Sequence, residues 1–343
     1  MKLSDRKKKI LSAVISENLK SADAVSSKDI QEKYYKDISS ATIRNELMSL
    51  EELGLLGKAH TSSGRVPTEE GFKAYISELM PEKKLTKKEL SLIKESFDGR
   101  MTEMESLAKN AAKAISSATN YASIVYFGVL DNAKIESVKI VKITDDSALV
   151  VVVTDVGIIK DITMQSSAKI TDEDYALASK LLTEALSGKT LAEVQSPDKF
   201  VDKIATKYRV MFNMVLSVIE KHGKDSEPLI DGTGKLLEQP EYQDISRAKH
   251  AISIFENKDT LLPLLKDNND IEISVKVGAD SGLNDCSVVT AEFKINGKSI
   301  GHAGVIGPMR MDYAKAISVL KSVSETISDK FYNKGDGSGE KRK

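Results

Sequence analysis

The sequence predicts a multidomain α+β protein, and three observations support that prediction. The chain has 343 residues, which is more than one hydrophobic core usually organises. Helical segments followed by a short hairpin are expected within the first 80 residues. Further along, Val- and Ile-rich segments typical of strands lie on both sides of a helical stretch, so we expect one domain to be interrupted by another.

The composition narrows the classes of protein to consider. Hydrophobic residues make up 41% of the chain, which excludes wholesale disorder, and the 5% of aromatic residues is lean for a protein that stacks on single-stranded bases. The formal net charge is −1, so a nucleic-acid-binding surface must come from locally gathered basic residues. The single cysteine, Cys286, excludes an internal disulfide and a cysteine-based zinc finger, and it is typical of a reducing compartment.

Targeting and membrane signals are not predicted. The N-terminal residues lead into a polar helix and not into an apolar signal core. The longest strongly apolar run, 148–153, is far too short to span a bilayer. We therefore expect a cytoplasmic protein that has no membrane partner.

The N-terminal segments follow the order of a helix-turn-helix. Residues 5–19 carry one apolar stripe at helical spacing, with a basic cluster at 6–9. Ser27 is the expected N-cap of a short second helix. A longer third helix is expected over 39–53, and Gly54 supplies its C-terminal stop. A short helix, a tight connection and a longer helix form the helix-turn-helix plan.

The third helix has one face suited to a core and another suited to DNA bases. Its apolar side is formed by Ile43, Leu47 and Leu50. Asn45 and Met48 point to the opposite side, and Arg44 lies on the flank. Asn can bind an adenine edge, and Arg a guanine edge, through two hydrogen bonds at once. Each such side chain–base pair is worth about 1–3 kcal/mol of discrimination. Ser40 and Thr42 lie where phosphates would be met.

Residues 55–68 predict a β-hairpin whose turn is a Ser-Gly pair. Lys58, His60 and Arg65 place positive charge on its arms, as in a basic wing that grips the DNA backbone or minor groove. The full set of DNA-binding residues that we predict is Ser40, Thr42, Arg44, Asn45, Met48, Lys58, His60, Thr61, Ser62, Gly64 and Arg65. Exposed Arg and Asn on a helix are often only solvated, and some winged helices contact proteins, so a protein-interaction module is one alternative.

Six stretches resemble the signatures of one known family. They are 40–47, 50–56, 60–68, 234–242, 285–289 and 304–313. The stretch 234–242 looks like the family's G-x-x-x-L-x-Q-P-E-[FY] segment. On these blocks the chain resembles the heat-inducible transcription repressor HrcA family. Ser63 and Met309 depart from the Ala and Thr often found there, and neither is a residue that we assign to reading DNA.

The resemblance implies a homodimer that represses chaperone operons by binding double-stranded DNA at an inverted repeat called CIRCE. It further implies that the chaperonin GroEL keeps this repressor active. It also implies a GAF-like domain with an inserted dimerisation domain. The boundaries that we expect are a winged helix at 1–80, a linker helix at 81–120, a split GAF-like domain at 121–165 and 226–332, a helical dimerisation domain at 166–225 and a disordered tail at 333–343. A GAF-like domain can hold a small molecule in its pocket, so a ligand-responsive regulator is a second alternative.

Beyond the hairpin, the periodicity predicts helices and strands in turn. Residues 87–120 and 312–331 are expected to be helical. The strand candidates are 123–129, 137–143, 148–153, 271–277, 288–295 and 299–306. A near-heptad stripe is formed by Phe200, Ile204, Tyr208, Met211, Val215 and Val218. The stripe suits either a core helix or a dimer contact, and we favour the dimer contact because the segment interrupts two sets of strands.

Enzyme chemistry is not predicted. Residues 232–235 superficially resemble a phosphate loop, but the earlier glycine is absent and Leu236 stands where a Ser or Thr is needed. The four histidines do not have the spacing of metal ligands. Cys286 is expected to be a small buried hydrophobe. We therefore expect no catalytic residues, no metal and no cofactor.

Overall fold

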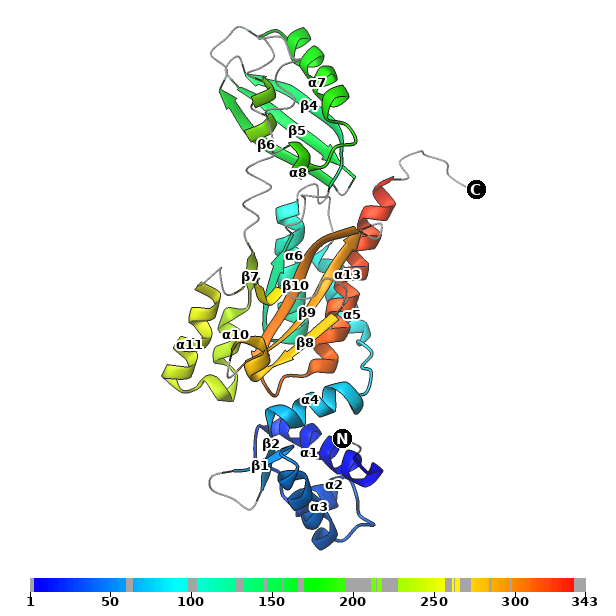
Figure 1. The fold of residues 1–343 in the computed structure, drawn as a ribbon, viewed down its shortest axis with the longest axis vertical. Coiled ribbons are helices and arrows are strands. Elements are labelled where there is room, and N and C mark those ends of the chain that lie inside the picture. Colours follow the sequence, from blue (N-terminus) through cyan, green and yellow to red (C-terminus); the bar gives the residue numbers. More distant parts are fainter. Residues whose placement is uncertain are drawn as a thin grey trace, which may run out of the picture.

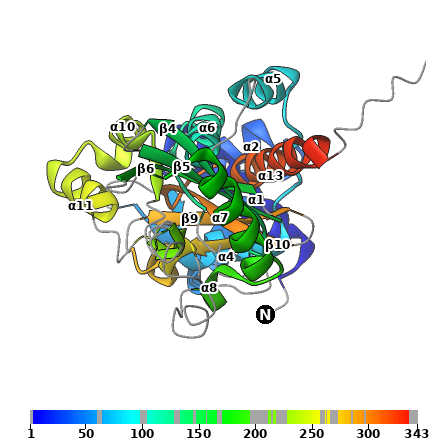
Figure 2. The same ribbon diagram turned by 90° about the horizontal axis from the view of Figure 1, so that it is seen from above.

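The computed structural model describes residues 3–59, 64–97, 104–127, 133–144, 147–155, 157–165, 170–194, 211–213, 215–217, 228–256, 261, 263–265, 273–283, 286–295 and 298–335. These residues form three parts that follow one another along the longest axis of the molecule (Figure 1). A winged helix lies at one end, a five-stranded sheet with its helices in the middle, and a three-stranded sheet at the other end. The view along that axis shows α13 and α11 on opposite sides of the middle part (Figure 2).

The first part is a winged helix-turn-helix. Its elements are α1 (Asp5–Ser21), α2 (Ser27–Lys33), α3 (Ser40–Glu52), β1 (Leu56–Lys58), β2 (Arg65–Pro67) and α4 (Glu69–Glu78). The N-cap that we predicted for α2, Ser27, is wrong by one residue. Ser26 caps the helix, because its hydroxyl accepts the N–H of Asp29 at 3.2 Å and the Asp29 carboxylate accepts the N–H of Ser26 at 3.0 Å.

A single apolar core joins the helices of this part. Its fully buried side chains include Ile10 and Val14 of α1, Ile30 of α2, and Ile43 and Leu50 of α3. The predicted apolar stripes therefore face inward. Burial of side chains of this size typically contributes about 1.5–3 kcal/mol each.

A buried carboxylate ties the end of α1 to the end of α2. Glu17 is 7% exposed and accepts hydrogen bonds from Lys20 at 2.7 Å, from Lys33 and from the Tyr34 hydroxyl at 2.7 Å. These hydrogen bonds, that of Lys20 foremost, lower the pKa of Glu17 from 4.5 to about 2. The charged carboxylate is thus the form that the fold favours.

The predicted linker helix, 87–120, consists of two helices. α5 (Lys87–Ser96) begins with a capping box between Thr86 and Glu89, and α6 (Met104–Thr119) follows. Phe97, directly after α5, is fully buried. A buried aromatic side chain at this point belongs to the core, so α5 and α6 form part of the middle domain and are not a free linker.

The middle domain is built on an antiparallel sheet with the strand order β7-β3-β10-β9-β8. The strands are β3 (Ala122–Tyr126), β7 (Leu229–Asp231), β8 (Ile273–Val277), β9 (Cys286–Ile295) and β10 (Lys298–Pro308). One face packs on α6 and α13 (Tyr313–Gly335), and the other on α10 (Thr233–Leu237), η4 (Pro240–Tyr242) and α11 (Ile245–Glu256). Alternate residues of β3 divide between the two cores: Ile124 faces the second and Val125 the first.

The third part is a separate sheet with the order β4-β5-β6. It contains β4 (Ile135–Thr144), β5 (Ser147–Thr154) and β6 (Gly157–Gln165), followed by α7 (Asp172–Leu186) and α8 (Leu191–Val194). Along the edge strand β4, the N–H groups of Val138 and Ile140 donate to the hydroxyls of Thr183 and Ser179 of α7, each at 2.9 Å. The hydroxyls of α7 therefore occupy main-chain hydrogen-bonding groups at this sheet edge.

This sheet corrects the predicted division of the chain. We expected 121–165 to form one domain with 226–332, but only β3 of that first stretch joins the large sheet. The change of sheet falls between Tyr126 and Ile135, and the inserted part contains strands as well as helices. The β4–β5 and β5–β6 pairs join strands that are consecutive in the sequence, whereas β3 pairs with the distant β7 and β10.

Two further expectations fall largely outside the described residues. Most of the near-heptad stripe over 200–218 lies there; of its members, Met211 and Val215 are described, and both are buried. Of the predicted tail, 336–343 lies there as well. Among the helices that the structure describes, none combines the length and the apolar character needed to cross a bilayer.

Candidate nucleic-acid interface

The third helix, α3, presents two contrasting faces. The Ser39 hydroxyl accepts the N–H of Thr42 at 3.1 Å and so starts the helix after an extended residue. Arg44 and Asn45 are exposed, and Met48 is 46% exposed, opposite the buried stripe. α3 lies at the outer end of the molecule, away from the five-stranded sheet (Figure 1). A double helix can therefore approach this face without meeting the other domains.

The two hydroxyl residues at the start of α3 have partners within the protein. The Ser40 hydroxyl lies 3.0 Å from that of Ser27, and the Thr42 hydroxyl lies 2.8 Å from that of Ser39. Both side chains are half-buried. The Ser40 contact joins the start of α3 to the start of α2, and the Thr42 contact stays within the N-terminus of α3. Contact of either residue with phosphates stays a prediction.

Arg65 and Lys58, the cations of the wing, differ in exposure. They are cross-strand partners in the β1–β2 pair. The Arg65 side chain is 12% exposed, and its Nε and Nη2 lie 2.7 and 2.6 Å from Oε2 of Glu51 on α3. The Lys58 side chain is 69% exposed, with Nζ 3.4 Å from Oε1 of Glu51. Burial alone raises the pKa of Glu51, but the ion pairs with Arg65 and Lys58 outweigh it and hold that pKa below its ordinary value.

Arg65 also connects the wing to the loop before α2. The backbone N–H and C=O of Arg65 form two hydrogen bonds with Val25, both 2.9 Å long. Gly64 is buried against Ala24, whose Cβ would lie 2.8 Å from a Cβ added at Gly64. The structure gives both residues a packing role in the wing, and DNA contact by them stays a prediction. His60, Thr61 and Ser62 lie outside the described residues.

Sequence reasoning missed the carboxylates that hold these cations. Glu46 of α3 lies 2.8 Å from Lys7, and Glu78 of α4 lies 2.7 Å from Lys8. Together with Glu51, these carboxylates form ion pairs that connect basic side chains of α1 and of the wing to neighbouring helices. A carboxylate at helical spacing on the same side as a nearby basic cluster is the signal that could have indicated such pairs.

The features that we rejected as enzyme sites have structural partners. The ammonium of Lys235 donates to the carbonyl of Ser116 at 2.7 Å. Cys286 is buried, with Sγ 3.1 Å from the Tyr242 hydroxyl. Within the described ranges, groups of three or more His, Cys, Asp or Glu side chains that could hold a metal ion are not found.

Two family profiles match the chain and together span most of it. Residues 2–79 match the family described as "Winged helix-turn-helix transcription repressor, HrcA DNA-binding". Residues 105–317 match "HrcA protein C terminal domain". The chain belongs to the HrcA family. The HrcA winged-helix match covers α1 to α4, and the C-terminal match runs from α6 into α13.

Named relatives agree with HrcA membership. The chain is 32% identical over 333 residues to the heat-inducible transcription repressor HrcA of Halalkalibacterium halodurans, covering 95% of this chain and 97% of that one. It is 33% identical to the HrcA of Ruminiclostridium cellulolyticum, covering 96% and 97% of the two chains. A crystal structure of a hypothetical protein aligns with a TM-score of 0.68 at 22% identity, covering 97% and 99%, and so shares the fold.

Proposed function

We propose that this protein represses heat-shock chaperone operons by binding, as a homodimer, to an inverted-repeat operator of the CIRCE type. The observation that supports the proposal most is the exposed Arg44 and Asn45 on α3, opposite a fully buried stripe. Side chains that can form paired hydrogen bonds with guanine and adenine edges are thereby held on a rigid helix. The HrcA relatives are themselves named heat-inducible transcription repressors.

Within this proposal, the wing and the start of α1 bind the DNA backbone. The exposed Lys58 is suited to a phosphate contact, as is the exposed Lys9 of α1, the helix that packs on α3. Phosphate contacts position the helix on the duplex, and base contacts select the sequence. Two winged helices in a two-fold dimer would read half-sites separated by a whole number of helical turns.

The proposal includes the chaperonin GroEL as the partner that maintains repression. This part rests on the family resemblance and on the heat-inducible naming of the relatives. If the chaperonin refolds the repressor, the amount of active repressor depends on how much chaperonin is free. When heat-damaged proteins occupy the chaperonin, repression of its operon falls.

The test is a titration of the full chain with a fluorescent CIRCE-type duplex and with a scrambled duplex of equal length. We expect preferential binding to the inverted repeat, and a steep fall in affinity as salt rises. Arg44→Ala should remove most of the preference. A folded protein that binds both duplexes equally would contradict the proposal, and a parallel titration with GroEL and ATP tests the partner separately.

A further inference from the structure

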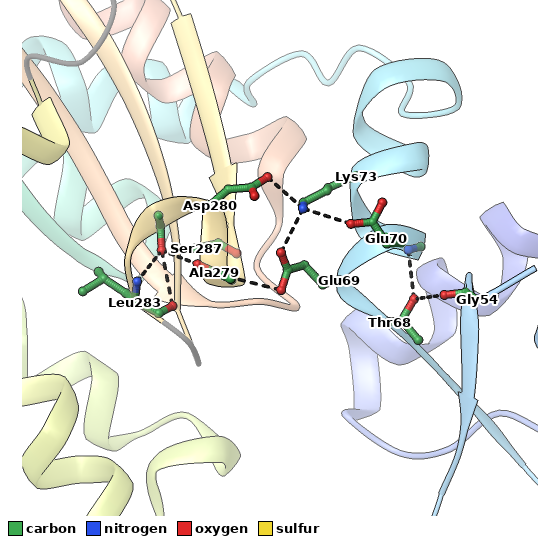
Figure 3. Close-up of polar contacts among 12 residues, drawn as sticks. Gly54, Thr68, Glu69, Glu70, Lys73, Ala279, Asp280, Leu283 and Ser287 are labelled. Atoms are coloured by element: carbon green, nitrogen blue, oxygen red, sulfur yellow. Dashed lines mark hydrogen bonds and ion pairs between the residues drawn. The ribbon is translucent and has the colours of Figure 1, made fainter. Parts of the chain in front are cut away.

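The winged helix meets the middle domain at a surface far from α3. We call this surface the domain junction and define it by Glu69 and Lys73 of α4, η5 (Gly278–Ser281) after β8, and Arg310 after β10. α4 lies between α3 and the five-stranded sheet (Figure 1), and its charged side chains point toward η5 (Figure 3). The domain junction therefore lies on the side of α4 that faces the sheet, away from α3 (Figure 1).

One side of the domain junction is a charged contact between α4 and η5. The ammonium of Lys73 lies 2.8 Å from the carboxylate of Asp280, and it also pairs with Glu69 and Glu70 at 2.9 and 3.0 Å (Figure 3). Glu69 in turn accepts the N–H of Ala279 at 3.3 Å. The two domains thus exchange an ion pair and a backbone hydrogen bond across the same short segment.

The approach of η5 to the Glu69 side chain depends on a glycine. Gly278 has a φ of +54°, and a Cβ added there would lie 2.4 Å from the Oε2 atom of Glu69. Any other residue would be strained in this conformation and would push Glu69 away. The close contact between α4 and η5 is therefore specified by the local backbone as well as by charge.

The other side of the domain junction is held by Arg310. Its side chain is 13% exposed and donates to the carbonyl of Leu19, near the end of α1, at 3.3 Å. The same guanidinium is paired with Glu241 of η4, with Nη2 donating at 3.2 Å. The rings of Phe72 of α4 and Tyr313 of α13 also pack, with centroids 6.2 Å apart. The winged helix is thus restrained through both α1 and α4.

The ion pair between α4 and η5 positions the winged helix without a large energetic contribution. The Asp280 side chain is 58% exposed, and ion pairs with exposed partners add little to stability. Polar contacts of this kind between domains permit relative motion when they are broken. Breaking them should let the angle of the winged helix change, while the buried rings of Phe72 and Tyr313 keep it attached.

We propose that Lys73 and Arg310 are positioning residues for operator binding, because they set the angle at which each winged helix leaves the middle domain. The inference rests on the proposed function. On an inverted repeat, that angle decides whether both α3 helices reach their half-sites at once. Simultaneous attachment raises affinity by about 10²–10⁴-fold and is lost when the geometry forbids it.

The test compares binding of the full chain to a complete inverted repeat and to a duplex with one half-site. Lys73→Glu places a further carboxylate beside Asp280, Glu69 and Glu70 and leaves α3 and the wing unchanged. Lys321→Glu, at an exposed position of α13, is the matched control because it makes the same change of charge outside the domain junction. We expect Lys73→Glu to lower the full-site to half-site affinity ratio about tenfold relative to this control, with half-site affinity unchanged within about twofold.

The double variant Lys73→Glu with Asp280→Lys supplies a cation that can pair with the carboxylates of α4, and it should restore most of the lost ratio. A ratio for Lys73→Glu that equals or exceeds that of Lys321→Glu would overturn the proposal, as would a double variant no better than the single one. If circular dichroism shows that Lys73→Glu does not fold, Arg310→Gln enters the same comparison. A wild-type chain that binds the full site no better than the half-site would instead contradict the proposed function.

Discussion

The buried carboxylate of Glu17 allows a quantitative prediction for the DNA-binding part. Replacement by Gln keeps the size of the side chain and removes its charge. A pKa of about 2 in the folded state, against 4.5 ordinarily, corresponds to an upper bound on the order of 3 kcal/mol at neutral pH. Lys20 and Lys33 are 67% and 55% exposed, so solvent screens their charges, and we expect about 2 kcal/mol.

The sign of the pH dependence follows from the lowered pKa. The contribution of Glu17 is fully present above pH 4.5 and is lost as the pH falls through about 2. Hydrogen exchange of the full chain, measured by mass spectrometry on peptides from α1 and α2, reports the contribution of Glu17 to the local stability of these helices. At pH 7, Glu17→Gln should accelerate exchange about 30-fold. After correction for the intrinsic exchange rate, the free-energy difference between the variant and the wild type should roughly halve at pH 3.

The matched control is Glu32→Gln. Glu32 is 63% exposed and forms only an i,i+4 pair with Lys28 at 3.7 Å, so its replacement should change exchange by less than about threefold. Equal effects of the two variants would refute the reasoning, and so would a Glu17→Gln effect that does not depend on pH.

Three other predictions concern DNA binding and the wing. Arg44→Ala should weaken operator binding by about 1–3 kcal/mol and leave the melting temperature unchanged, as measured by anisotropy and calorimetry; a drop of several degrees would show that its side chain is part of the core. Lys58→Ala should weaken binding to operator and random duplexes alike and lower the salt slope by about one, whereas a sequence-dependent loss would indicate a base contact. Arg65→Ala should accelerate amide exchange in β1 and β2, because it removes the ion pair with Glu51; unchanged exchange would mean that the wing is held without it.

The local features of the winged helix were predictable from the sequence. Helical spacing identified the inward face of α3, and the exposed Arg44 and Asn45 follow from that face. The hairpin followed from a Ser-Gly pair between short extended arms, and the structure pairs Leu56–Lys58 with Arg65–Pro67. Such features depend on residues close in sequence, so periodicity and turn chemistry suffice.

The features that depend on distant residues were not predictable. The partner of Arg65 is a carboxylate of another element, Glu51, and only the fold brings the two together. The strand β6 was missed, and β4 and β5 were placed with the wrong sheet, because strand character does not specify the pairing partner. The domain junction joins Lys73 to Asp280 across most of the chain, so spacing could not indicate it.

The covered edge of β4 has a consequence for the response of this protein to heating. An uncovered strand edge offers free amide and carbonyl groups to other extended chains, which is a common route to aggregation. Ser179 and Thr183 occupy such groups of Ile140 and Val138 for as long as α7 stays in place. Heating that detaches α7 would therefore turn a protected surface into a template for self-association.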